Sequence, residues 1–185
     1  MLISKFDTQD IAEKVTEFES YYGINLPEQY KHFLHRYNGG LTPDTKFKIG
    51  KETSDIRAFF GIGHVAYSFT NRNDLENWLK KNLLPIACDS FGNVIVISLS
   101  ESTTGKIYFC DHEENCKPTF IAENLKEFVK LCKSKKMVPV RTIEEREQDL
   151  IARGRGHIIN ERLKKMWQEE IDEYGCIKQE NVVID

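Results

Sequence analysis

The sequence predicts an α+β fold in which amphipathic helices cover a sheet of antiparallel strands. Apolar residues recur at helical spacing near both ends of the chain, and the segments between them alternate or run continuously apolar, as strands do. The chain has 185 residues, of which 40% are apolar and 30% charged. A chain of this length buries a core without needing disulfides or metals.

Two short helices are predicted near the start of the chain. The first spans residues 8–22, with Asp7 or Thr8 as its cap. The second starts at Pro27, whose missing N–H costs nothing at the first helical position. It stops at the Asn-Gly-Gly sequence of residues 38–40, which adopts positive φ easily. Both helices present an aromatic stripe, so they must cover another apolar layer.

That layer is predicted to be a sheet. Strands are expected over residues 46–49, 56–62, 85–88, 94–99, 106–110 and 119–121, with 64–69 continuing the sheet, and further helices over 73–81 and 122–132. The segment from Val94 to Ile97 is apolar on both faces, which indicates a central strand covered on both sides. The sequence Asp-Ser-Phe-Gly-Asn of residues 89–93 is typical of a turn.

The C-terminal part is predicted to be helical. Thr142 and Glu145 have the spacing of a capping box. A last helix over residues 158–174 carries an apolar stripe that includes a Trp and a Tyr. We therefore expect a domain over residues 1–140 and a helical extension over 141–185 that packs on the same domain. A dimer or partner interface is the alternative explanation for the stripe.

Charge and composition exclude several classes of function. The net charge is −3, and residues 1–140 carry 18 basic and 18 acidic side chains. No part of the sequence is basic enough to predict direct nucleic-acid binding. No run of 18 apolar residues and no secretory signal is present, and the five scattered cysteines suit free thiols. These features predict a cytoplasmic protein without a membrane segment.

Several segments, taken in order, resemble the Smi/Knr-like branch of the SUKH superfamily. They are GINLPEQYKHFL with YNGG (residues 23–40), LPIACDSFGN (84–93), GKIYFCDHE (105–113) and the helix that follows Ile121-Ala122. The resemblance covers residues 8–132, although Cys110 stands where the family often has Trp.

The resemblance implies a mixed, largely antiparallel sheet flanked by helices, without catalytic residues or a cofactor. Bacterial members are mostly immunity proteins of polymorphic or contact-dependent toxin systems, which bind and neutralise a cognate toxin domain, often a nuclease. Fungal members regulate cell-wall synthesis. We therefore expect an immunity protein that is not an enzyme and that binds a toxin as a monomer or homodimer. The alternative is an intracellular regulatory adaptor or scaffold.

A metal site was weighed against this interpretation. Cys110, His112 and Cys116, with Cys88 as a fourth ligand, supply the atoms that zinc prefers. Their spacing matches no standard zinc pattern, and the chain has no paired C-x-x-C. The favoured interpretation is a buried strand cysteine followed by a loop histidine and a loop cysteine, with no metal.

A Cys–His–Asp hydrolase built from Cys110, His112 and Asp111 is the enzyme alternative. It requires a thiolate next to a base that a third group orients. Cys110 lies in an apolar run, where a thiol is inert. Such triads are also assembled by the fold from separate segments rather than from three nearly adjacent residues.

The partner-binding surface is predicted at an acidic loop. Asp111, His112, Glu113 and Glu114 follow a strand directly, and Asp89 precedes the turn of the neighbouring hairpin. Loops of this kind carry function, and an acidic patch steers a basic partner such as a nuclease. A solvated hairpin loop is the alternative interpretation of the same residues.

Overall fold

The computed structural model describes residues 1–137, 139–175 and 177–184. Its helices are α1 (Ile11–Tyr22), α2 (Glu28–Tyr37), α3 (Leu75–Leu79), α4 (Leu125–Leu131), α5 (Ile143–Ala152) and α6 (Glu161–Tyr174). Its strands are β1 (Leu2–Lys5), β2 (Gly40–Ile49), β3 (Glu52–Phe59), β4 (Leu83–Cys88), β5 (Val94–Ser98), β6 (Ile107–Cys110), β7 (Pro118–Ala122), β8 (Lys133–Ser134) and β9 (Glu180–Asn181). The α+β prediction is confirmed.

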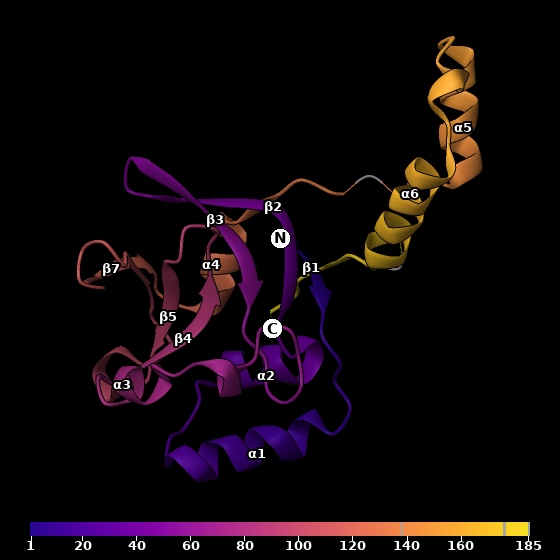
Figure 1. The fold of residues 1–185 in the computed structure, drawn as a ribbon. Coiled ribbons are helices and arrows are strands. Elements are labelled where there is room, and N and C mark those ends of the chain that lie inside the picture. The colour runs from indigo at the N-terminus through magenta and orange to yellow at the C-terminus, as the bar shows by residue number, and fades with distance from the viewer. Residues whose placement is uncertain (138, 176, 185) are drawn as a thin grey trace. The chain divides into compact units, whose positions relative to one another are not determined.

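The strands form one sheet in the order β7-β6-β5-β4-β3-β2-β1-β9, and β8 pairs with β2 beside β1. Figure 1 labels β1 to β5 and β7 of this sheet. Every ladder within the described ranges is antiparallel. The one parallel element recorded there is the isolated bridge between Gly61 and Ser68. Consecutive strands from β2 to β7 are therefore neighbours, as expected of hairpin connections.

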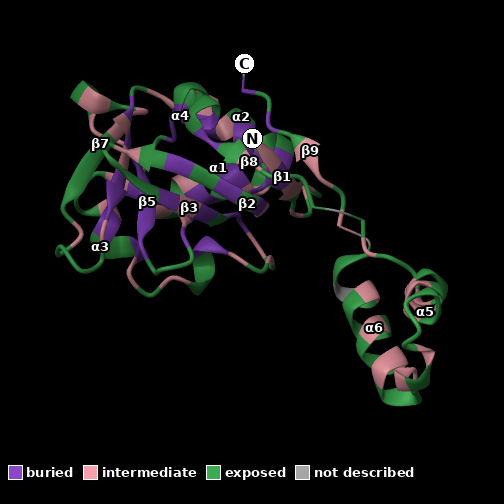
Figure 2. Cartoon of the chain, turned by 90° about the horizontal axis from the view of Figure 1, so that it is seen from above, coloured by how far each residue is buried: buried purple, intermediate pink, exposed green. Residues whose placement is uncertain are grey.

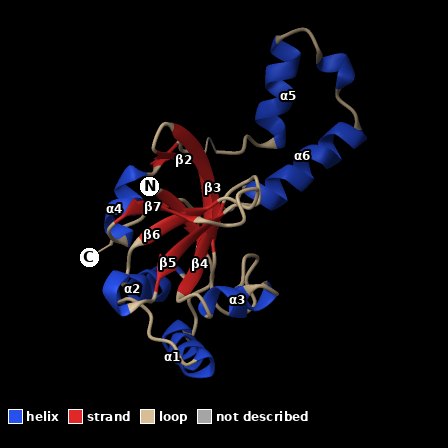
Figure 3. Ribbon diagram, turned by 90° about the vertical axis from the view of Figure 1, so that its left-hand side faces the viewer, coloured by secondary structure: helices blue, strands red, loops and turns tan. Residues whose placement is uncertain are grey.

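Helices cover the sheet on both faces (Figure 3). Helices α1, α2 and α4 bury their apolar stripes against one face in the main core, where Tyr30, Phe33 and Phe128 are almost fully enclosed. On the opposite face, Trp78 of α3 packs in a smaller cluster with Val94, Val96 and Cys110. Purple, buried positions accordingly follow the central strands in Figure 2. The predicted two-sided burial of β5 is confirmed, because all five of its residues are buried.

A corner at the end of α2 joins the helices to the sheet. Asn38 ends α2 in the left-handed conformation (φ 48°) and is only 1% exposed. Its side-chain amide donates to the carbonyls of Asp7 (2.7 Å) and Ile62 (3.0 Å), and its oxygen accepts from the Ile62 N–H (2.8 Å). One buried side chain therefore satisfies three backbone groups from two other segments.

Two short strands that the sequence does not predict, β1 and β9, complete one edge of the sheet. β1 pairs with β2 on one side and with β9 on the other. The Tyr37 hydroxyl accepts from the Val183 N–H (2.9 Å) and donates to the Asn181 carbonyl (3.3 Å). Val182 and Ile184 join the main core. Residues 179–184 accordingly belong to the same compact unit as residues 1–136.

Some predicted boundaries move. α1 begins at Ile11 rather than residue 8, because Asp10 takes positive φ (55°) and Asp7 instead accepts from the Gln9 N–H. Residues 64–69 do not continue the sheet as a strand: a loop there turns back through Gly63 (φ 91°), and Ser68 forms only an isolated bridge with Gly61. Local hydrogen bonds thus replace the first helical turn in one place and strand pairing in the other.

Residues 137–178 form a second compact unit, described here by itself. It is a pair of helices, α5 and α6, with the predicted capping box between Thr142 and Glu145 present. Arg146 pairs with Glu170 (2.7 Å), and Lys164 pairs with Glu147 (2.6 Å). No described side chain of this unit is fully buried. Packing of the predicted extension on the domain stays a prediction, and Cys176 lies outside the described residues.

No helix in the described part of the chain is both long and apolar enough to cross a membrane.

The corner at Asn38 generates a prediction with a matched control. Gly39 has φ +76°, and a Cβ added there would lie 2.6 Å from the Phe59 carbonyl oxygen. Gly50 has φ +60° with nothing within 4 Å of an added Cβ. Gly50→Ala should cost about 1 kcal/mol of unfolding free energy for the left-handed backbone alone. Gly39→Ala should cost about 3 kcal/mol or more, because the backbones of β2 and β3 must also separate. Equal losses in urea unfolding would contradict the close approach.

Candidate functional site

The turn between β4 and β5 is built around a buried carboxylate. Asp89 is 3% exposed. Its Oδ1 accepts from the backbone N–H groups of Phe91 (2.9 Å) and Asn93 (2.8 Å), and its Oδ2 accepts from the Ser54 hydroxyl (2.9 Å) and the Asn93 amide (2.7 Å). Four donors satisfy the buried charge, so Asp89 acts inside the fold and fixes the shape of the turn.

A second carboxylate holds the same turn from outside. Asp55 of β3 accepts from the Ser90 N–H (3.1 Å) and the Ser90 hydroxyl (2.6 Å). Gly92 takes φ +96°, which lets the chain reverse into β5. Phe91 is thereby left at the tip of the turn with 71% of its surface exposed. The hairpin presents a large apolar side chain on a rigid support.

The predicted acidic loop begins directly after β6. Asp111 accepts from the Glu113 N–H (2.8 Å) through its side chain and from the Cys116 N–H (2.8 Å) through its carbonyl. These two bonds close a tight loop. Glu113 and Glu114 are exposed, and Asp111 is half-buried. Two carboxylates of the loop therefore face solvent on a short, hydrogen-bonded backbone.

His112 connects this loop to the β4–β5 turn. Its backbone N–H (3.0 Å) and its ring Nδ1 (2.7 Å) both lie within hydrogen-bond distance of the Asn93 side-chain oxygen. Since the Asn93 amide nitrogen donates to Asp89, its oxygen is the acceptor and His112 Nδ1 carries the proton. The predicted residues Asp89 and Asp111–Glu114 are thus joined through Asn93, with only the loop residues on the surface.

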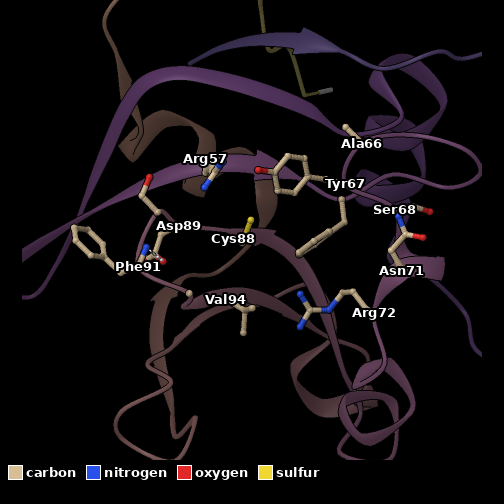
Figure 4. Close-up of a pocket in the computed structure, with 13 residues that line it drawn as sticks. Arg57, Ala66, Tyr67, Ser68, Asn71, Arg72, Cys88, Asp89, Phe91 and Val94 are labelled. Atoms are coloured by element: carbon tan, nitrogen blue, oxygen red, sulfur yellow. Dashed lines mark hydrogen bonds between the residues drawn. The ribbon is translucent and has the colours of Figure 1, made fainter.

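A groove lies beside the turn, and Phe91 is one of the residues that line it (Figure 4). It has a volume of about 580 Å³ and is open to solvent. We call it the arginine groove; the residues that line it include Arg57, Phe60, Tyr67, Arg72, Cys88 and Phe91. The sequence does not predict this groove, because its lining comes from β3, the 60–72 segment and the β4–β5 turn. The one signal for it in the sequence was Phe91, an aromatic residue at the centre of the five-residue turn 89–93.

Asp74 positions Arg72 in this groove. Asp74 Oδ2 accepts from Arg72 Nη2 (2.6 Å) and from the Trp78 indole N–H (2.8 Å). Partial burial alone would raise the pKa of Asp74, but the hydrogen bonds from Trp78 and Arg72 and the charge of Arg72 outweigh it and lower that pKa. The guanidinium of Arg72 also lies over the Phe60 ring, 4.7 Å from its centroid.

The residues weighed for metal or thiol chemistry occupy different environments. Cys110 is fully buried in the cluster with Trp78, and this burial raises the pKa of its thiol to about 12. His112 points to Asn93, and among the described residues it shares no hydrogen bond with Cys110. Across the same residues, no group of three or more His, Cys, Asp or Glu side chains is arranged to hold a metal ion.

Taken together, the fold and this surface define an α+β protein with an antiparallel sheet and a turn and loop held rigid at one end of it. Residues 12–129 match the SUKH_6 family, described as SMI1-KNR4 cell-wall. The chain therefore belongs to the SUKH superfamily, which includes toxin immunity proteins. The family resemblance drawn from the sequence is confirmed.

The chain is also similar to a bacterial protein. It is 29% identical over 129 residues to the SPbeta prophage-derived uncharacterized protein YokK of Bacillus subtilis strain 168. The match covers 59% of this chain and 66% of that protein. No solved structure matches the chain.

The buried carboxylate generates a stability prediction. Asp89→Asn keeps the volume of the side chain. It replaces one of the two accepting carboxylate oxygens with an NH2 group, which faces hydrogen-bond donors and cannot accept from them. We expect the free energy of unfolding to fall by about 2 to 4 kcal/mol. Asp111→Asn is the matched control, because Asn still accepts from the Glu113 N–H at a partly exposed position. It should cost less than about 0.5 kcal/mol in the same urea titration, and a similar loss for both variants would contradict the role of Asp89.

The thiols generate a reactivity prediction. Burial raises the pKa of Cys110 and of Cys132 to about 12, so both remain neutral thiols at pH 8. Iodoacetamide should therefore alkylate half-exposed Cys116 while leaving those two unmodified in the native protein, as peptide mass spectrometry would show. In denaturant all three should react. Rapid alkylation of native Cys110 at pH 8 would instead indicate an activated nucleophile and support the enzyme alternative.

Proposed function

We propose that the protein is an immunity protein that binds a cognate toxin domain, a nuclease of a polymorphic or contact-dependent toxin system, and neutralises it in the cytoplasm of the producing cell. The observation that carries the proposal is membership of a superfamily that includes toxin immunity proteins. The protein acts by occlusion and not as an enzyme. The buried, neutral Cys110 thiol supports this part of the proposal.

The acidic loop is the proposed contact surface. Asp111, His112, Glu113 and Glu114 lie on a loop that is anchored to the β4–β5 turn through Asn93. A rigid loop loses little conformational entropy on binding, so more of the contact energy appears as affinity. Its carboxylates suit the basic surface with which a nuclease holds nucleic acid. Asp89 is proposed to serve this surface by positioning it, since its own carboxylate is enclosed.

The test is co-expression with the toxin domain encoded directly upstream of this protein, scoring survival and co-purification together. Immunity predicts that the protein restores growth and co-purifies with the toxin. The second candidate function is an intracellular regulatory adaptor or scaffold, which the description of the matched family as SMI1-KNR4 cell-wall favours. That function predicts that no toxin gene lies next to the gene of this protein. Co-purification with the toxin domain without any restored growth would also support it.

Charge reversal tests the surface. Asp111, Glu113 and Glu114 changed together to Lys should weaken toxin binding by about tenfold or more at low salt, because attraction becomes repulsion. The loss should shrink as salt rises, since exposed charges are screened. Calorimetric titration at two salt concentrations measures both effects.

The matched control reverses three other exposed carboxylates of the same unit, Glu17, Glu52 and Glu101, none of which is in an ion pair within the described residues. It makes the same change in net charge, so its affinity loss should be no more than about twofold. Equal losses for the two triple variants would remove the acidic loop from the interface.

A further inference from the structure

The arginine groove contains hydrogen-bond donors that the protein itself does not use. Arg72 is held at one edge by Asp74 and over Phe60, and its side chain is only 16% exposed. Its Nε is buried and has no hydrogen-bond partner among the described residues. A buried donor without a partner costs free energy unless a ligand or water satisfies it.

Arg57 supplies a second guanidinium from the opposite side of the groove. It is exposed, its guanidinium lies 5.9 Å from the centroid of the Tyr67 ring, and within the described residues it forms no ion pair. Figure 4 shows Arg57 and Arg72 on either side of Cys88. Cys88 lines the groove between them, and burial raises the pKa of its thiol although the charges of Arg72 and Arg57 act to lower it.

The one acidic residue of the lining, Asp89, pairs with neither arginine; Arg72 is paired with Asp74, outside the lining, and Arg57 forms no ion pair among the described residues. Both oxygens of Asp89 are occupied by Ser54, Phe91 and Asn93, and neither forms an ion pair with an arginine. The groove therefore offers planar guanidinium donors beside the apolar surfaces of Phe60 and Val94. Guanidinium groups in this setting select carboxylate or phosphate oxygens.

The setting favours a group presented by a protein. Phe91 stands exposed at the rim, and aromatic residues next to arginines are the common energetic centres of protein interfaces. The groove also adjoins the acidic loop, because Gly92 lines the groove and an added Cβ there would lie 3.9 Å from His112 Nδ1. A partner that covers the loop would also cover Phe91 and the groove mouth.

We propose that the arginine groove binds an acidic side chain of the protein partner, with the carboxylate held between Arg57 and Arg72 and the partner's apolar surface on Phe91. This rests on the proposed function and deepens it. The partner then presents opposite charges to two adjacent places: cations to the acidic loop and a carboxylate to the groove. Such alternation fixes the orientation of the complex and rejects partners that carry only a uniformly basic face.

The experiment compares two exposed arginines that lie over tyrosine rings. Arg57→Glu reverses the charge in the groove, whereas Arg36→Glu reverses it on α2, where Arg36 lies 5.5 Å from the Tyr37 ring centroid. Calorimetric titration with the toxin domain should show a loss of about tenfold or more for Arg57→Glu and no more than about twofold for Arg36→Glu. Phe91→Ala should also lose about tenfold, and thermal unfolding checks that each variant is folded. Native affinity in Arg57→Glu, or equal losses in both arginine variants, would overturn the proposal.

A second measurement needs no toxin. N-acetylglutamate amide titrated into the native protein should shift the side-chain Nε–H resonances of Arg57 and Arg72 in NMR spectra, and N-acetyllysine amide should not. Absence of these shifts would overturn the groove, even where the toxin binds. Larger shifts with inorganic phosphate than with the glutamate compound would also overturn it, by identifying a phosphate site. If the toxin does not bind the native protein at all, the proposed function fails, and this titration alone decides the groove.

Discussion

The fold depends on the buried amide of Asn38, which fixes the place where the helical layer meets the sheet. Its three hydrogen bonds reach the segment before α1 and the segment after β3, while its own backbone turns α2 into β2. The neighbouring backbones approach so closely that an added Cβ at Gly61 would lie 2.1 Å from the Asn38 carbonyl oxygen. A buried network of this kind has few alternative arrangements, because any other conformation leaves polar groups unpaired in the core.

The same logic recurs at the β4–β5 turn around Asp89, with a different result. At Asn38 the hydrogen bonds hold layers together, whereas at Asp89 they shape a turn and, through Asn93, support the loop that starts at Asp111. Hydrogen bonds therefore fix the loop of the proposed binding surface to the hairpin of β4 and β5. Its exposed groups are few, and the enclosed groups behind them set their positions.

The sequence predicts the elements whose signal is local, and the structure adds those whose signal is not. The two-sided apolar run at Val94–Ile97 and the capping box at Thr142 could be recognised from adjacent residues. β1 and β9 are too short for a period to appear, and they form only because distant segments pair. The burial of Asp89 could not be predicted either, since aspartates usually lie on the surface and its partner Ser54 is 35 residues away. The arginine groove depends on three such separate segments.

The return of the chain to β1 has a topological consequence. The helical pair of residues 137–178 leaves the first unit after β8 and re-enters it before β9, so it is an insertion whose two ends are both anchored in one sheet. Lengthening an insertion of this kind costs little, because each doubling of a flexible loop adds only about 0.6 kcal/mol of closure entropy. The length of this inserted pair can therefore change at little cost in free energy while the host sheet keeps all of its strands.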